Sequence, residues 1–205
     1  MKLRNSVLSF VSFFFLTMSF YSNAALITGL YNTGQGGENN PDLNYSLLFG
    51  TAYVSSNVDL NPSWDKNDLS SSWITPFKNA NTSADPVTNG NYIYMTGFDL
   101  TGDPATAFLE GQFESDNFVS IYLNGVEIAS STKNDYKNWT DFSTNANFKS
   151  GINILAFDVV NVAQASGNPT GLRVRFCDPV SEPDSYLMIM SGIGLLGFIA
   201  RRKVV

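Results

Sequence analysis

The side chains available for chemistry are carboxylates, amides and tryptophans, because the chain has no histidine. Histidine is the usual base of serine and cysteine hydrolases and a common zinc ligand. Its absence therefore excludes Ser–His and Cys–His catalysis and histidine metal sites. Cys177 is the single cysteine, so no internal disulfide can form. We predict no catalytic residues.

Three tryptophans occur in polar, loop-like stretches rich in acidic residues such as Asp65, Asp68, Asp135 and Asp141. Aromatic rings stack on sugar rings, and carboxylates or amides bond the sugar hydroxyls. Trp64 and Trp139 are therefore the candidate ligand-binding residues. The alternative is that the indoles fill a core. Trp73 fits that alternative best, since Ile74 and Phe77 flank it.

Acidic and amide residues cluster at several turns, in residues 38–42 and around Asp99, Asp103 and Asp116. We predict no cofactor and no metal ligands, with a structural calcium ion as the alternative because calcium prefers oxygen ligands. A glycoside hydrolase that uses carboxylates alone is an alternative function. That reaction requires two carboxylates about 5 to 10 Å apart, and the sequence alone does not show which pair would lie at that distance.

The elements that must position these residues have the alternation of β-strands, and residues 25–179 show no sustained helical period. In 171–176, Leu172, Val174 and Phe176 alternate with Arg173 and Arg175. Asn124-Gly125 predicts a hairpin between strands at 117–123 and 126–129. Further strands are expected at 26–31, 43–54, 91–100, 105–113 and 151–162, the last centred on Ile154, Ala156 and Val159. The long polar stretch 55–90 is expected to hold short strands or a binding surface.

About eight strands at this spacing predict an all-β fold, an antiparallel jelly-roll sandwich. Residues 25–179 hold seven Lys and Arg against sixteen Asp and Glu, a net charge of −9. Such an acidic domain repels nucleic acid, so nucleic acid is excluded as a partner.

Residues 1–24 have the pattern of a secretory signal peptide. Lys2 and Arg4 precede an aromatic and aliphatic run, and small residues follow it. We expect the Sec translocon and signal peptidase as partners, with cleavage between Ala24 and Ala25. A retained transmembrane helix is the alternative.

The C-terminal stretch 180–205 combines a short polar start, an apolar run at about 186–200 and a basic cluster at 201–203. The run of about 15 residues would form roughly 22 Å of helix, short for a hydrocarbon core of about 30 Å. We expect a thin transmembrane helix with a cytoplasmic C-terminus. Three glycines leave its backbone open to a close partner. Such a segment suits transient recognition by a processing enzyme better than permanent residence in the membrane.

This stretch resembles the PEP-CTERM sorting signal, with Ser181 in place of the first proline. The resemblance rests on Val180, Glu182, Pro183, Tyr186, Gly192, Gly194, Leu195, Leu196, Gly197, Phe198, Ala200, Arg201, Arg202 and Lys203. It implies an inner-membrane-anchored precursor and recognition by an exosortase, which would cut near Glu182-Pro183. The product would be released or placed at the cell surface. A plain C-terminal membrane anchor is the alternative.

The middle of the chain resembles the galactose-binding-like jelly roll that often accompanies this signal. The segments that carry the resemblance lie at 29–34, 42–45, 72–74, 98–102, 107–111, 116–117, 122–125, 151–157 and 171–174. In that fold such segments belong to the core and the turns, and they define no set of catalytic residues. We therefore expect a secreted, non-enzymatic surface or biofilm-matrix protein that associates with exopolysaccharide. The hydrolase and the permanently anchored surface protein remain the alternatives.

Overall fold

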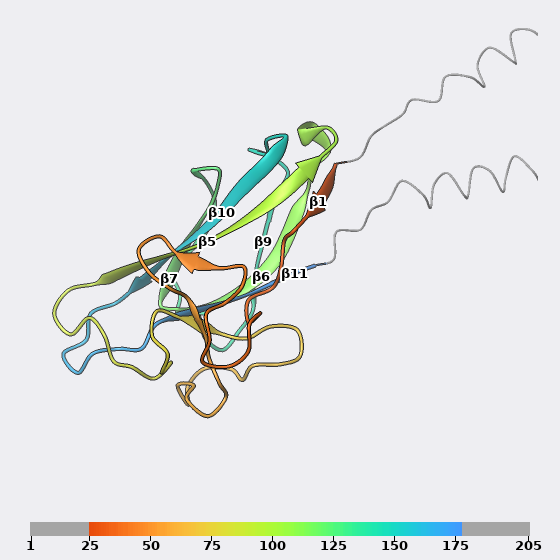
Figure 1. The fold of residues 1–205 in the computed structure, drawn as a ribbon. Coiled ribbons are helices and arrows are strands. Elements are labelled where there is room, and N and C mark those ends of the chain that lie inside the picture. Colours follow the sequence, from red (N-terminus) through yellow and green to blue (C-terminus); the bar gives the residue numbers. More distant parts are fainter. Residues whose placement is uncertain (1–24, 178–205) are drawn as a thin grey trace, which may run out of the picture. The chain divides into compact units, whose positions relative to one another are not determined.

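The computed structural model describes residues 25–177, which form two antiparallel sheets packed face to face (Figure 1). The six-stranded sheet has the order β1-β5-β10-β7-β8, and β2 also pairs with β5. Its strands are β1 (Leu26–Thr28), β2 (Ser46–Leu47), β5 (Gly90–Thr101), β7 (Phe118–Leu123), β8 (Val126–Ser131) and β10 (Gly151–Asn161).

The five-stranded sheet has the order β3-β4-β11-β6-β9. Its strands are β3 (Tyr53–Val54), β4 (Ile74–Thr75), β6 (Leu109–Asp116), β9 (Thr140–Thr144) and β11 (Gly171–Phe176). All pairs are antiparallel, so the prediction of an all-β antiparallel sandwich is confirmed. No helix within residues 25–177 is long and apolar enough to cross a membrane. The predicted signal peptide and transmembrane helix lie outside the described residues.

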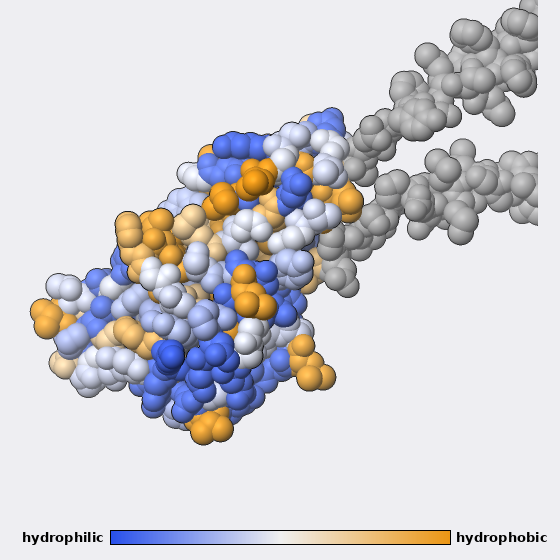
Figure 2. Space-filling model, viewed as in Figure 1, coloured by the Kyte–Doolittle hydropathy of each residue, from blue (hydrophilic) through white to orange (hydrophobic). Residues whose placement is uncertain are grey.

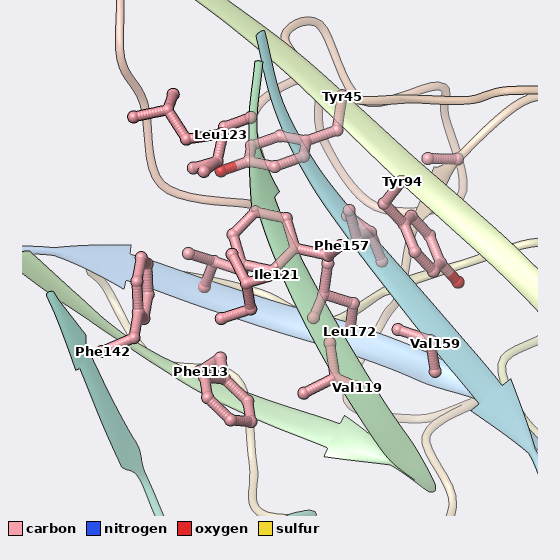
Figure 3. Close-up of a cluster of buried hydrophobic side chains, with 14 of the residues drawn as sticks. Tyr45, Tyr94, Phe113, Val119, Ile121, Leu123, Phe142, Phe157, Val159 and Leu172 are labelled. Carbon is pink, nitrogen blue, oxygen red and sulfur yellow. The ribbon is translucent and has the colours of Figure 1, made fainter. Parts of the chain in front are cut away.

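The main core lies between the two sheets and is filled by alternate residues of the long strands (Figure 3). Leu155, Phe157 and Val159 of β10 face Phe113 of β6 and Leu172 of β11 across the layer, and all five are fully or almost fully buried. Phe142 of β9 packs edge-on against Phe157, with ring centroids 5.9 Å apart. The described residues form one compact unit around this core.

Two expectations about individual strands are wrong. Ile154 and Ala156 lie on the outer face of β10, and Leu155 and Phe157 face the core instead. The strand expected from residue 105 begins at Leu109. Before it, the Asp103 carboxylate accepts a hydrogen bond from the Ala105 amide and caps a 3₁₀ turn at Pro104–Thr106. Both faces of β10 carry apolar residues, so local alternation does not choose which set faces inward, and strand pairing decides it.

The hairpin at Asn124-Gly125 is confirmed. It joins β7 to β8, and both turn residues have the positive φ that favours this pair, 52° and 84°. The Asn124 side chain also bonds the Asn153 side chain and the Ile154 amide of β10. The turn is therefore tied to the neighbouring strand as well as to its own hairpin.

Two strand glycines on opposite faces provide a matched test of this packing. A Cβ built on Gly111 would lie 2.8 Å from the Phe142 ring. One on Gly97 would meet Ile154 and the Asn153 carbonyl oxygen at ordinary contact distances, 3.6 and 3.7 Å. Gly111→Ala should lower the free energy of unfolding by about 1–3 kcal/mol through overpacking. Gly97→Ala should cause no loss. Chemical denaturation of both variants checks this, and equal effects would contradict the inward placement of Gly111.

Candidate functional site

A second cluster of aromatic residues covers the outer face of the five-stranded sheet, and the long 55–73 stretch supplies most of it. Trp64 and Trp73 stack with ring centroids 4.3 Å apart and are 3% and 0% exposed. Leu60, Ala80 and the partly buried Tyr136 complete the cluster. The stretch therefore folds back on the sheet and encloses a small core of its own.

Trp64 lies over Gly171 of β11, where a Cβ would come within 2.8 Å of the indole. Its Nε1–H donates to the Asp116 carboxylate of β6 at 2.7 Å. With 3% of its surface exposed, the indole fills a core, as the packing alternative describes, and presents no platform to a ligand. The prediction that Trp73 is a core residue is confirmed.

Next along β11, Arg173 carries a guanidinium that is almost fully buried, a feature that strand alternation does not predict. Its Nε donates to the Ser71 hydroxyl at 3.0 Å, and its Nη1 donates to the Lys66 carbonyl at 2.8 Å and to Glu114 at 3.1 Å. Its Nη2 lies 2.7 Å from the Asp68 carboxylate. Arg173 thus joins two strands of the sheet to the 55–73 stretch.

The carboxylates around Arg173 have shifted pKa values. Burial raises the pKa of Glu114 to about 7; Arg173 opposes the shift and Asp65 adds to it. Burial also raises the pKa of Asp116 to about 6, against the hydrogen bond from Trp64. At Asp68 burial is outweighed by hydrogen bonds from Ser70 and Ser71 and by Arg173, and the pKa falls to about 2.

Trp139, just before β9, lies over both arginines of β11. The guanidinium carbons of Arg173 and Arg175 are 4.7 and 4.1 Å from the indole centroid. Cation–π contacts of this kind fix the indole on the sheet. Trp139 remains partly exposed, in contrast with Trp64.

Beside Trp139, three polar side chains form a row across β11, β6 and β9. The Arg175 Nε donates to Gln112 at 2.7 Å, and the Gln112 amide donates to Asp141 at 2.6 Å. The three are register partners on adjacent strands. We call Trp139, Arg175, Gln112 and Asp141 the Trp139 platform. It offers an indole, a guanidinium, an amide and a carboxylate on one solvent-facing side of the sheet.

The acidic turns have structural roles. Asp42 accepts hydrogen bonds from the backbone amides of Gly34, Gln35, Asn44 and Tyr45 and so closes its own loop. Within residues 25–177, no group of three or more cysteine and acidic side chains is arranged to hold a metal ion. Cys177 is exposed at the end of β11.

The model of the PEP-CTERM protein-sorting motif matches residues 179–203. The chain carries a PEP-CTERM sorting motif. The motif indicates an exported protein whose membrane-anchored precursor is processed by exosortase. The predicted sorting residues from Val180 to Lys203 all lie within the match. They lie outside the residues that the structure describes.

No curated protein matches the chain. Among solved structures, a family 35 carbohydrate-binding module from Paenibacillus barcinonensis is 13% identical, with a TM-score of 0.36, and the match covers 72% of this chain and 96% of that one. A second module of family 35, from an environmental isolate, is 7% identical, with a TM-score of 0.35 and coverage of 73% and 94%. Likenesses this distant carry no argument about the site.

Sequence reasoning named Trp139 and the nearby Asp141 but missed the site residues that other strands contribute. Arg173, Arg175, Gln112 and Glu114 come from strands whose pairing the sequence does not show. The available signal was the pair of arginines two positions apart in an otherwise apolar strand of an acidic domain. Two such side chains share one face of a strand.

The pKa values predict how stability depends on pH. Glu114 and Asp116 bind protons more tightly in the folded state, so their contribution is full below the ordinary carboxyl pKa, about 4, and is lost as pH rises through about 6 to 7. The free energy of unfolding of residues 25–179 should therefore fall between about pH 4 and pH 7. Glu114→Gln should remove the larger part of that fall. Denaturant titrations at several pH values check this, and an unchanged slope in the variant would contradict the assignment to Glu114.

Proposed function

We propose that the PEP-CTERM protein is a secreted, non-catalytic module that holds exopolysaccharide at the cell surface. Signal peptidase cuts before Ala25, exosortase cuts near Glu182-Pro183, and the mature sandwich then associates with the matrix. The sorting motif supports the destination. The observation that carries the binding role is the partly exposed indole of Trp139, fixed over two guanidiniums beside a row of polar side chains.

The chemistry of the Trp139 platform suits a sugar. An indole held by cation–π contacts on the protein is already ordered, so a bound sugar ring needs little further ordering of the side chain. Arg175 and the Gln112 amide supply donors, and Asp141 supplies acceptors, for hydroxyl groups around that ring. The buried half of the same face, centred on Arg173, keeps the platform in place without facing the ligand.

Binding should depend on Trp139. Trp139→Ala should weaken the affinity of residues 25–179 for the host's exopolysaccharide by about tenfold or more, because it removes the aromatic surface at the centre of the platform. Calorimetry with exopolysaccharide purified from the organism that produces this protein, called the host here, measures the affinity. Phe49→Ala is the matched control, since Phe49 is 93% exposed and lies on a loop bordering the other sheet. Equal loss in both variants would contradict a role for the platform.

Processing should depend on the basic cluster. Replacing Arg201, Arg202 and Lys203 with glutamine should leave a precursor that keeps its C-terminus, because the cluster sets the orientation of the apolar segment. Mass spectrometry of the protein from the host checks both ends of the chain. Lys149→Gln, in the exported domain, is the control for loss of positive charge and should be processed normally. Normal trimming of the triple variant would contradict the assigned role of the cluster.

A further inference from the structure

The outer face of the six-stranded sheet carries charge of one sign. Its strands contain no lysine or arginine, and their charged residues are Asp99, Glu127 and Asp158. All three belong to the outward set. The strand neighbours of Asp99 and Asp158, such as Phe98 and Phe157, are buried. Glu127 pairs with Tyr122, whose own neighbours Ile121 and Leu123 are buried. The five-stranded sheet differs, since Arg173 and Arg175 lie on its outer face. A ligand for the six-stranded sheet should therefore carry positive charge.

Asp158 lies in the middle of this face. It is the register partner of Ser120 on β7 and of Ile93 on β5, with Ala156 and Val160 on either side along β10. Its Oδ1 is shielded from solvent and accepts no hydrogen bond from any group in residues 25–177. Burial raises the pKa of this carboxyl. A shielded acceptor without a donor costs free energy, and a ligand that brings a donor would recover it.

The row next to Asp158 is apolar and partly exposed. Tyr122 of β7, Ala156 of β10 and Met95 of β5 are register partners across three strands. Ile154, the next outward residue of β10, is 38% exposed. Figure 2 shows hydrophobic patches on the side of the domain where β5 and β10 lie in Figure 1. The row gives a flat apolar strip beside an unpaired carboxylate.

We infer that this face binds a polysaccharide that carries free amino groups. The apolar side of a pyranose ring would lie on the Tyr122–Ala156–Met95 strip, and its ammonium group would donate to Asp158. Glu127, the register partner of Tyr122, adds negative charge at the edge of the strip. The inference rests on the proposed function and adds a second site, on the opposite sheet from the Trp139 platform.

A sugar fits this face better than a basic peptide does. Peptides that bind sheets usually add a strand at a free edge, where the backbone groups are unpaired. β10 lies between β5 and β7 and is paired on both sides over most of its length. The centre of the face therefore offers side chains and a flat surface, which suit ring stacking and a single charged contact.

Calorimetry of residues 25–179 with soluble chitosan oligosaccharides tests the inference. The wild-type domain should bind, and the fully N-acetylated oligosaccharides should bind at least about tenfold more weakly because they lack the ammonium group. Asp158→Asn, which keeps the shape of the side chain, and Tyr122→Ala should each weaken chitosan binding by a similar factor. Raising the salt concentration from about 0.05 to 0.5 M should weaken it further. Leu69→Ala is the matched control and should keep wild-type chitosan affinity, since Leu69 is fully exposed on the 55–73 stretch and belongs to neither site.

The outcomes separate this inference from the proposed function. Unchanged affinity in both folded variants, equal binding of the N-acetylated oligosaccharides, or equally strong competition by oligolysine would overturn the inference. If the host exopolysaccharide still bound in a Trp139-dependent way, the proposed function would stand without the second site. If neither polysaccharide bound the wild-type domain, both would fail. Circular dichroism of each variant confirms that it is folded.

Discussion

The buried guanidinium of Arg173 is the interaction on which the outer face of the five-stranded sheet depends. A charged group that is almost removed from water is tolerated only when its donors are paired, since desolvation is expensive. Arg173 meets this condition with partners from β6 and from the 55–73 stretch. A long polar stretch without regular structure is thereby fastened to the sheet. The same guanidinium supports the indole of Trp139, so the fastening also sets the geometry of the platform.

The buried acids show what this arrangement costs. Glu114 is fully buried, and its pKa is raised even though a guanidinium is in contact with it. Desolvation therefore outweighs the attraction of Arg173 at this position. Asp68 has the opposite balance because it is half exposed and accepts several hydrogen bonds. One cation thus holds a carboxylate that stays charged and a carboxyl that titrates near neutrality.

The parts that sequence could predict are those fixed by neighbours along the chain. The Asn124-Gly125 turn needs positive φ at two successive residues, which a dipeptide can reveal. The sorting motif, whose residues are contiguous, was likewise visible in the sequence. The alternation in β11 separates Leu172 and Val174 from the arginines. It could not show that Arg173 is buried, because the cover comes from residues more than 100 positions earlier.

The two tryptophans show why residue type and local context were not enough to define a site. Trp64 and Trp139 have similar polar neighbours, yet the fold brings both to one sheet face and gives them different roles. Trp64 meets Gly171, whose missing side chain admits an indole directly onto the sheet, and it is enclosed there with Trp73. Trp139 meets two arginines instead, which hold the ring above the strand and leave it partly open. The identity of alternate residues in β11 therefore decides which tryptophan becomes core and which stays accessible to a ligand.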